Sequence, residues 1–197
     1  MINVLIERDF QFLAAIYFQG EFQFNVYDLT LHMEVNTESV REQHVAIERV
    51  KYFILNCLDS CIFINESEKN LIEKYEDCGL KVCALSDDPY DQIVALIILA
   101  KSEAITEGRM EITDVLLTSR LSDGVKFKES IESVKSDLIG RGWWSEASPM
   151  IVSQTKLQNK KEKIVKLIHN DNDWNEFDLG WKEKNNSTPE IIFTPEK

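Results

Sequence analysis

Two long segments near the start of the chain alternate between apolar and polar residues. In residues 10–18 the even positions are apolar, and in residues 21–35 apolar positions also recur every second residue. This period of two is typical of half-buried strands, and Gln19-Gly20 between the segments supplies a turn, so the pattern predicts a β-hairpin. The alternation in the second segment slips by one residue at Tyr27-Asp28, which predicts a β-bulge there. A short helix over residues 9–18 is the alternative interpretation.

Helical periodicity follows the predicted hairpin. Ser39 with Glu42 three residues later forms a capping-box pattern, which commonly starts a helix. Apolar residues then recur every three or four positions, so an amphipathic helix is predicted over residues 40–58. A shorter helix is predicted over residues 67–79, where Gly79 provides the stop.

The most regular part of the chain is a third helix and the strand after it. Asp88 is a suitable N-cap and Pro89 a suitable first helical residue. Residues 93–100 are all apolar, and a helix that is apolar on nearly every side should be covered on most of them. The β-rich residues 110–119 follow, and the Asp123-Gly124 turn predicts a strand that pairs back onto them.

These elements predict an α+β fold. Short strands are also expected over residues 61–65 and 80–85, and a helix over residues 129–138. The expected architecture is an antiparallel sheet with helices packed on one face, plus a C-terminal helical arm. The composition changes at Arg141, so we expect a core domain over residues 1–140, followed by a helical arm and polar tail over residues 141–197.

The order hairpin, helix, helix, hairpin within residues 10–131 resembles the tunnelling fold of pterin- and purine-binding enzymes. The segment Val45-Ala-Ile-Glu-Arg-Val-Lys, which leads to Leu58-Asp59, is similar in texture to the first helix of that fold. The resemblance implies topology alone, because the zinc-binding histidines of the family have no counterparts in this chain. Fold alone would not imply function in any case.

The charge balance restricts the partners that the chain can bind. The chain of 197 residues has a net charge of -12, and 44% of its residues are hydrophobic. Such a surface repels nucleic-acid phosphates and anionic membranes, so neither is an expected partner. The one basic run, Lys160–Lys163, is interpreted as a solvated helix face. The acidity is interpreted first as a contribution to solubility. The more specific interpretation is an acidic face that docks on a basic partner.

Cofactor and metal chemistry has little local support. The cysteines and histidines are Cys57, Cys61, Cys78, Cys83, His32, His44 and His169. They form neither a Cys-x-x-Cys pair nor a closely spaced histidine pair, so no metal site and no cofactor are expected. Phosphate-binding loops and a Gly-x-Ser-x-Gly nucleophile motif are also missing. Reduced thiols, no transmembrane segment and a start unlike a secretory signal indicate the cytoplasm.

Five charged residues around the third helix are the candidates for chemistry. They are Asp88, Asp91, Glu107, Arg109 and Asp114. Asp88 and Asp91 suit a helix cap and first turn, and Glu107 can pair with Arg109. Asp114 interrupts an apolar run and would need a cationic partner if buried. The structural interpretation is favoured for all five, and a metal or acid/base site is the alternative.

The C-terminal segment is rich in aromatic residues. The candidates for binding a partner are Trp143, Trp144, Trp174, Phe177 and Trp181. Exposed aromatic residues at the density of the last three usually pack on another surface. Trp143-Trp144 could instead stack on a base or a sugar, but packing between the core and the C-terminal arm is the favoured interpretation of this pair. We therefore expect a non-catalytic acidic interaction protein: an oligomer subunit, an inhibitor or an adaptor that docks on a basic protein partner. A homo-oligomer is compatible with this. The alternative is an enzyme that binds a nucleotide or another heterocycle in a carboxylate-lined pocket between subunits.

Overall fold

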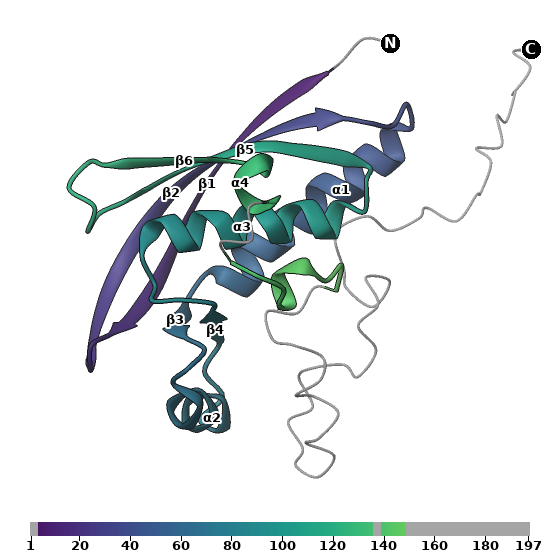
Figure 1. The fold of residues 1–197 in the computed structure, drawn as a ribbon. Helices are drawn as coiled ribbons and strands as arrows, with labels where there is room; N and C mark the ends of the chain where they lie inside the picture. The colour runs from purple at the N-terminus through teal and green to yellow at the C-terminus, as the bar shows by residue number, and fades with distance from the viewer. Residues whose placement is uncertain (1–3, 136–138, 149–197) are drawn as a thin grey trace, which may run out of the picture.

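Six strands form a single sheet in the computed structural model, which describes residues 4–135 and 139–148 (Figure 1). The strands are β1 (Leu5–Phe18), β2 (Glu21–Val35), β3 (Cys61–Asn65), β4 (Val82–Leu85), β5 (Met110–Ser119) and β6 (Lys126–Ser130). Their order across the sheet is β4-β3-β1-β2-β5-β6. The predicted strands are therefore present, and β3 and β4 join the sheet beside the hairpin.

The sheet is mixed, so the prediction of an antiparallel sheet is wrong. β1–β2, β2–β5 and β5–β6 pair antiparallel, whereas β1–β3 and β3–β4 pair parallel. A helix, α2 (Lys69–Asp77), connects β3 to β4. It returns the chain to the end of the sheet at which β3 began, and a strand that starts from the same end must run parallel. With β3 and β4 in the sheet, the fold also departs from the order hairpin, helix, helix, hairpin.

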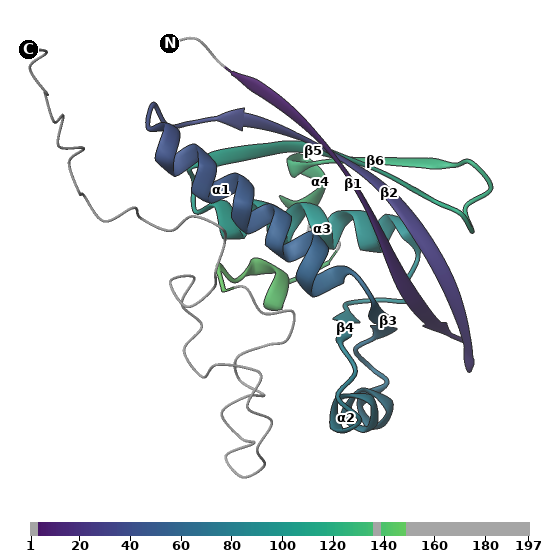
Figure 2. The same ribbon diagram turned by 180° about the vertical axis from the view of Figure 1, so that it is seen from behind.

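Helices cover both faces of the sheet rather than the single face expected. The other helices are α1 (Val40–Tyr52), which continues into a π-helical turn (Phe53–Leu58), α3 (Asp91–Thr106), α4 (Ile131–Lys135) and a 3₁₀ turn (Trp143–Ser145). α1 and α3 pack in the main core with Phe63 and Cys83, whereas α2 packs with their strand neighbours Ile62 and Val82. Because alternate strand residues face opposite sides, α2 lies on the face opposite α1 and α3. We call the face away from α1 and α3 the outer face (Figures 1 and 2).

The predicted hairpin is confirmed, and its bulge is elsewhere. Gln19 and Gly20 both have positive φ, 52° and 87°, as a two-residue type I′ turn requires. The β1–β2 register is unbroken through Tyr27 and Asp28; a register shift occurs instead between β2 and β5 at His32/Met33. The apparent slip arose because the apolar residues before Tyr27 lie on the outer face, whereas Tyr27 itself faces the core.

The ends of the helices are partly as predicted. Ser39 caps α1, and its hydroxyl oxygen accepts a hydrogen bond from the Glu42 amide at 3.4 Å. Asp88 is not the cap of α3, which begins after Tyr90; the Asp88 carboxylate instead accepts a hydrogen bond from the Asn65 side chain at 2.9 Å. At the C-terminus of α3, Glu107 adopts the left-handed conformation and ends the helix one residue before Gly108.

The described part of the predicted arm packs into the core. Trp143 and Trp144 are 3% and 2% exposed, and Trp143 lies against Phe53 with ring centroids 6.4 Å apart. The rest of the predicted arm, from residue 149 onward, lies outside the described residues. Among the helices that are described, none has the length and apolar character needed to cross a membrane.

Candidate functional site

The five charged candidates lie in three separate places. Asp88 and Asp91 lie at the start of α3, whereas Glu107 and Arg109 lie just beyond its end. Asp114 lies on β5, on the outer face of the sheet. The described residues therefore do not bring these five candidates together into a single catalytic pocket.

The start of α3 holds a partly buried carboxyl group. The Ser119 hydroxyl donates a hydrogen bond to Asp91 Oδ2 at 2.7 Å, and burial raises the pKa of the Asp91 carboxyl. Tyr27 is fully buried nearby, and its burial raises the pKa of the phenol well above the ordinary value. The Asp91 carboxylate and the Asn25 side chain are polar neighbours of the Tyr27 hydroxyl. The cluster joins the start of α3 to β5 through Ser119 and to β2 through Tyr27.

The end of α3 is held by a network of ion pairs. Glu107 Oε2 accepts hydrogen bonds from Arg49 Nη1 at 2.5 Å and from Arg109 Nη1 at 2.7 Å. Arg109 Nε also donates to the Glu42 carboxylate on α1 at 2.5 Å. The two arginines hold the pKa of Glu107 below its ordinary value. This network, which we call the clamp, joins α1 to the end of α3 and includes the pair between Glu107 and Arg109 that the sequence suggested.

A row of charged side chains crosses four strands on the outer face. His32 Nδ1 lies 2.7 Å from Asp114 Oδ1, and His32 Nε2 lies 3.5 Å from Glu7 Oε2. Lys128 Nζ on β6 lies 3.5 Å from the same oxygen of Asp114. Asp114 thus has two partners that the sequence interpretation missed, His32 and Lys128. The pairing of β5 with β2 and with β6 brings them together.

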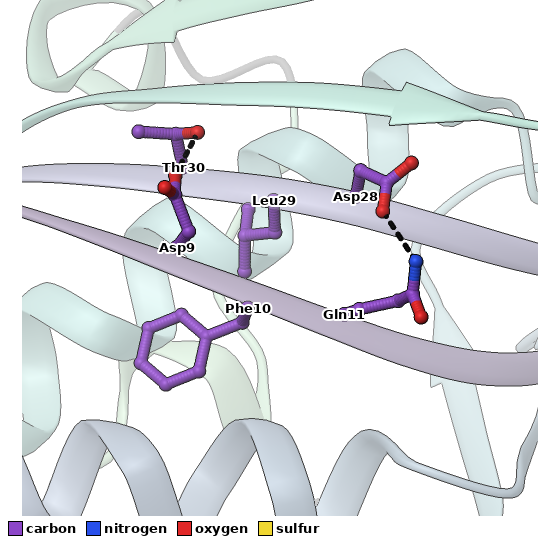
Figure 3. A pocket seen from close by; sticks show the side chains of 6 residues that line it. All are labelled: Asp9, Phe10, Gln11, Asp28, Leu29 and Thr30. Atoms are coloured by element: carbon purple, nitrogen blue, oxygen red, sulfur yellow. Dashed lines mark hydrogen bonds between the residues drawn. The ribbon is translucent and has the colours of Figure 1, made fainter.

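Two polar pairs continue this row along the hairpin (Figure 3). The Thr30 hydroxyl donates to Asp9 Oδ1 at 2.6 Å, and Gln11 Nε2 donates to Asp28 Oδ1 at 2.7 Å. These residues, with Phe10 and Leu29 of the same strands, line an open depression of about 340 Å³. The depression presents two carboxylates at a surface where water and a partner have access.

Beyond these pairs, the outer face becomes apolar toward the turn of the hairpin. Leu13, Phe22 and Phe24 are 43%, 44% and 77% exposed. Phe22 packs between Tyr17 and Tyr75 of α2, with ring centroids 5.1 and 5.5 Å away. The alternating pattern alone did not show which face Phe22 and Phe24 occupy. The buried register of β2 instead begins at Asn25 and Tyr27.

We define the outer surface as the uncovered part of this face. It comprises Glu7, Asp9, Gln11, Leu13, Phe22, Phe24, Asp28, Thr30, His32 and Asp114. Charged and polar groups occupy one end and exposed aromatic rings the other, which suits a partner that carries both cationic and apolar side chains. The described residues hold no cluster of three or more histidine, cysteine or acidic side chains able to bind a metal ion.

The aromatic residues predicted to bind a partner are only partly described. Trp143 and Trp144 are buried within the chain itself, and the Trp143 indole N–H donates to the Ala84 carbonyl oxygen at 2.9 Å. Trp174, Phe177 and Trp181 lie outside the described residues. Their role toward a partner stays a prediction.

The comparison with known proteins finds distant structural similarity and no match in sequence. No protein-family model and no curated protein matches the chain. An uncharacterized protein from Wolinella succinogenes has a similar structure, with 11% sequence identity and a TM-score of 0.47. The match covers 66% of this chain and 99% of the other. A likeness at this level carries no inference about function.

Proposed function

We propose that this chain is a non-catalytic acidic interaction protein that docks a basic protein partner on the outer surface. The observation that carries the proposal is the gradient along that surface, from the carboxylates of Glu7, Asp9 and Asp28 to the exposed rings of Phe22 and Phe24. Contiguous exposed apolar groups beside charged ones are typical of protein–protein contacts.

The charge of the chain supports a cationic partner. With a net charge of -12, the protein attracts basic surfaces over a distance of about one Debye length, roughly 10 Å at 0.1 M salt. Carboxylates at the polar end would then orient the partner, and the aromatic end would contribute the apolar contact area. Such a protein acts as an adaptor, an inhibitor or a subunit of a larger assembly.

The proposal places the protein in the cytoplasm. Cys57, Cys61, Cys78 and Cys83 are all free thiols, and free thiols persist in a reducing compartment. The partner would therefore be a cytoplasmic protein with a basic surface.

The His32–Asp114 pair favours a second, enzymatic function. A histidine held by a carboxylate at 2.7 Å can move protons as a general base, and Glu7 lies near its other nitrogen. In this proposal a neighbouring subunit would complete a pocket for a nucleotide or another heterocycle. Loss of turnover in Asp114→Asn, with folding intact, would support it.

Differential capture tests the docking proposal. The immobilised full chain, an outer-surface variant (Asp9→Lys with Asp28→Lys) and a control variant would be exposed to the same host lysate. The control, Glu66→Lys with Glu68→Lys, makes the same change of charge at exposed residues next to α2. We expect a basic protein that is retained by the wild type and the control and is lost by the outer-surface variant.

The captured protein would then be purified and titrated at rising salt. Its affinity for the wild type should fall as salt rises, and the outer-surface variant should bind at least about tenfold more weakly, equivalent to ~1.4 kcal/mol. Equal retention by all three chains, or capture of acidic proteins only, would contradict docking through this surface.

A further inference from the structure

Half of β1 has an unpaired edge. β1 pairs with β2 along its whole length, from Leu5 to Phe18. On its other side β1 pairs with β3 only at residues 14–16. Figures 1 and 2 both place β3 and β4 beside the end of β1 near the hairpin turn, whereas the beginning of β1 extends past them. Residues 5–12 therefore have no neighbouring strand on this side within the described structure.

The contacts of Leu13 show which backbone groups point to this edge. The Ser60 amide donates to the Leu13 carbonyl oxygen at 2.7 Å, and the Leu13 amide donates to Asp59 Oδ1 at 3.0 Å. Both groups of Leu13 thus point toward the β3 side of β1. Since backbone direction alternates along a strand, the N–H and C=O groups of residues 5, 7, 9 and 11 point the same way. No other described residue hydrogen-bonds to them on that side.

The side chains beside this edge sort into two chemically different rows. Glu7, Asp9 and Gln11 project onto the outer face and are exposed, whereas Phe10 and Phe12 project toward the core and are buried. A strand added along the edge would continue both rows, because side chains at neighbouring positions of adjacent strands share a face. Its outer positions would lie beside carboxylates, and its inner positions beside aromatic rings.

We infer that the free edge of β1 binds an extended segment of the partner by strand addition, and that this segment alternates basic and apolar residues. The inference rests on the proposed function and specifies the form of the partner. An edge of eight residues spans about 26 Å, so a partner segment of about eight residues would fill it. Backbone hydrogen bonds would supply affinity, and the alternating rows would supply specificity, as in other strand-addition complexes.

A second copy of this chain is a poor occupant of the edge. If two β1 edges paired antiparallel around Asp9, each copy would place its Asp9 beside that of the other and its Glu7 beside Gln11. Carboxylates directly opposite each other destabilise a strand pair, and charged residues on exposed edges hinder such self-pairing. The same carboxylates attract lysine and arginine, so the edge selects a basic strand.

Model peptides test the inference with the full-length protein. The first probe is a fluorescent ten-residue peptide of alternating lysine and valine, and the second has the same residues in a non-alternating order. Two further probes are N-methylated, one at every lysine and one at every valine. N-methylation removes the hydrogen-bond donors from one edge of a strand and leaves the other edge intact.

Strand addition predicts that the alternating peptide binds at least about tenfold more tightly than the reordered one. It also predicts that one N-methylated peptide binds like the parent, while the other binds at least about tenfold more weakly because several backbone hydrogen bonds are removed. If methylation of the lysines weakens binding, the peptide adds antiparallel, because residues directly opposite each other then exchange backbone hydrogen bonds. If methylation of the valines weakens binding, the peptide adds parallel, because the bonds then go to the residues on either side of the opposite one.

Charge variants separate the two proposals. Glu7→Lys with Asp9→Lys should weaken binding of the alternating peptide, while Glu66→Lys with Glu68→Lys should not. If the charge variant weakens binding but both N-methylated peptides bind like the parent, the strand-addition inference is overturned and the docking proposal survives. If none of the lysine peptides binds, or if the charge variant binds the alternating peptide like the wild type, the strand-addition inference and the docking proposal are both overturned. An edge already occupied by another part of the chain or by a second copy would give the first of these results.

Discussion

Lys101 holds Trp143 from inside the core. Its side chain is fully buried, and its amino group donates a hydrogen bond to the Trp143 carbonyl oxygen at 2.9 Å while lying 5.4 Å from the centroid of the Trp143 ring. The same amino group donates to the Glu146 carbonyl oxygen at 2.8 Å. A single buried cation on α3 therefore fixes the segment that follows α4.

The buried amino group should make stability depend on pH. Burial lowers the pKa of Lys101 to about 8, whereas an unfolded lysine titrates near 10.4. Between these values the unfolded chain binds a proton that the folded chain does not, so the free energy of unfolding rises with pH. Lys101 should contribute an increase on the order of 3 kcal/mol from below pH 8 to above pH 10, measured by urea unfolding.

Lys101→Met isolates this effect from other groups. Burial raises the pKa of Cys57 to about 12, so the unfolded thiol loses its proton first and stability falls as pH rises through the alkaline range. Cys57 is present in both proteins, so its effect is common to the two. Above pH 8 the free energy of unfolding of the wild type should therefore still rise relative to that of Lys101→Met. Parallel stability curves for the two proteins would contradict the assignment.

The clamp at the end of α3 predicts a second effect of pH, in the acid range. Glu107 pairs with Arg49, which is only 8% exposed, so Glu107→Gln weakens the compensation of a buried charge. The side chain of Glu107 is 43% exposed, and solvent screening limits the loss to about 1–2 kcal/mol at pH 7.

The sign of this effect follows from the lowered pKa of Glu107. The carboxylate contributes its full stabilisation above the pKa of Glu107 in the unfolded chain, near 4.3. This contribution is lost as the pH falls through the pKa of Glu107 in the folded chain. The deficit of Glu107→Gln relative to wild type should therefore shrink at pH 3 in urea unfolding. Glu111→Gln, at an exposed carboxylate of β5, is the control and should change stability by less than about 0.5 kcal/mol.

Asp91 should behave in the opposite way, because burial raises its pKa. Its folded carboxyl keeps a proton at pH values where the unfolded one has lost it, so stability from this group falls as pH rises through that range. Asp91→Asn still offers an oxygen to the Ser119 hydroxyl and does not titrate. The variant should gain stability relative to wild type from pH 3 to pH 7, and thermal unfolding at both pH values would show it. A loss relative to wild type over this range would contradict the prediction.

Local patterns in the sequence predicted most elements of the fold, because each element carries its own signal. The turn at Gln19-Gly20, the cap at Ser39 and the apolar helix over residues 93–100 depend on neighbours within a few positions. The direction of β3 and β4 depends on distant contacts. A strand, helix, strand order over residues 61–85 was nevertheless visible in the sequence, and that order is the usual signature of parallel pairing.

The outer surface was harder to predict than the fold. Asp114 was recognised as unusual, but its contact with His32 is between residues 82 positions apart and depends on the register shift in β2–β5. The face that Phe24 occupies was not evident, because an exposed phenylalanine and a buried one look alike in an alternating pattern. Register decides the face of every residue in a strand, and the pairing partner that fixes it lies far away in the sequence.

The contact between Gly142 and Trp144 gives the last prediction. A Cβ atom at Gly142 would lie 2.5 Å from the Trp144 ring, which is 2% exposed. Because the backbone of Gly142 is extended, with φ of -163°, the constraint comes from this ring and not from the conformation of the backbone. Gly142→Ala should therefore displace a packed indole and cost about 1–3 kcal/mol of stability.

A double-mutant cycle with Trp144→Leu tests whether the ring is the cause. Trp144→Leu alone should destabilise the protein, since it removes a large buried side chain. In that background Gly142→Ala should cost less than about 0.5 kcal/mol, because the smaller side chain leaves room for the added methyl group, giving a coupling energy of at least about 0.5 kcal/mol in urea unfolding. Equal costs of Gly142→Ala in both backgrounds would show that Trp144 does not set the requirement for glycine.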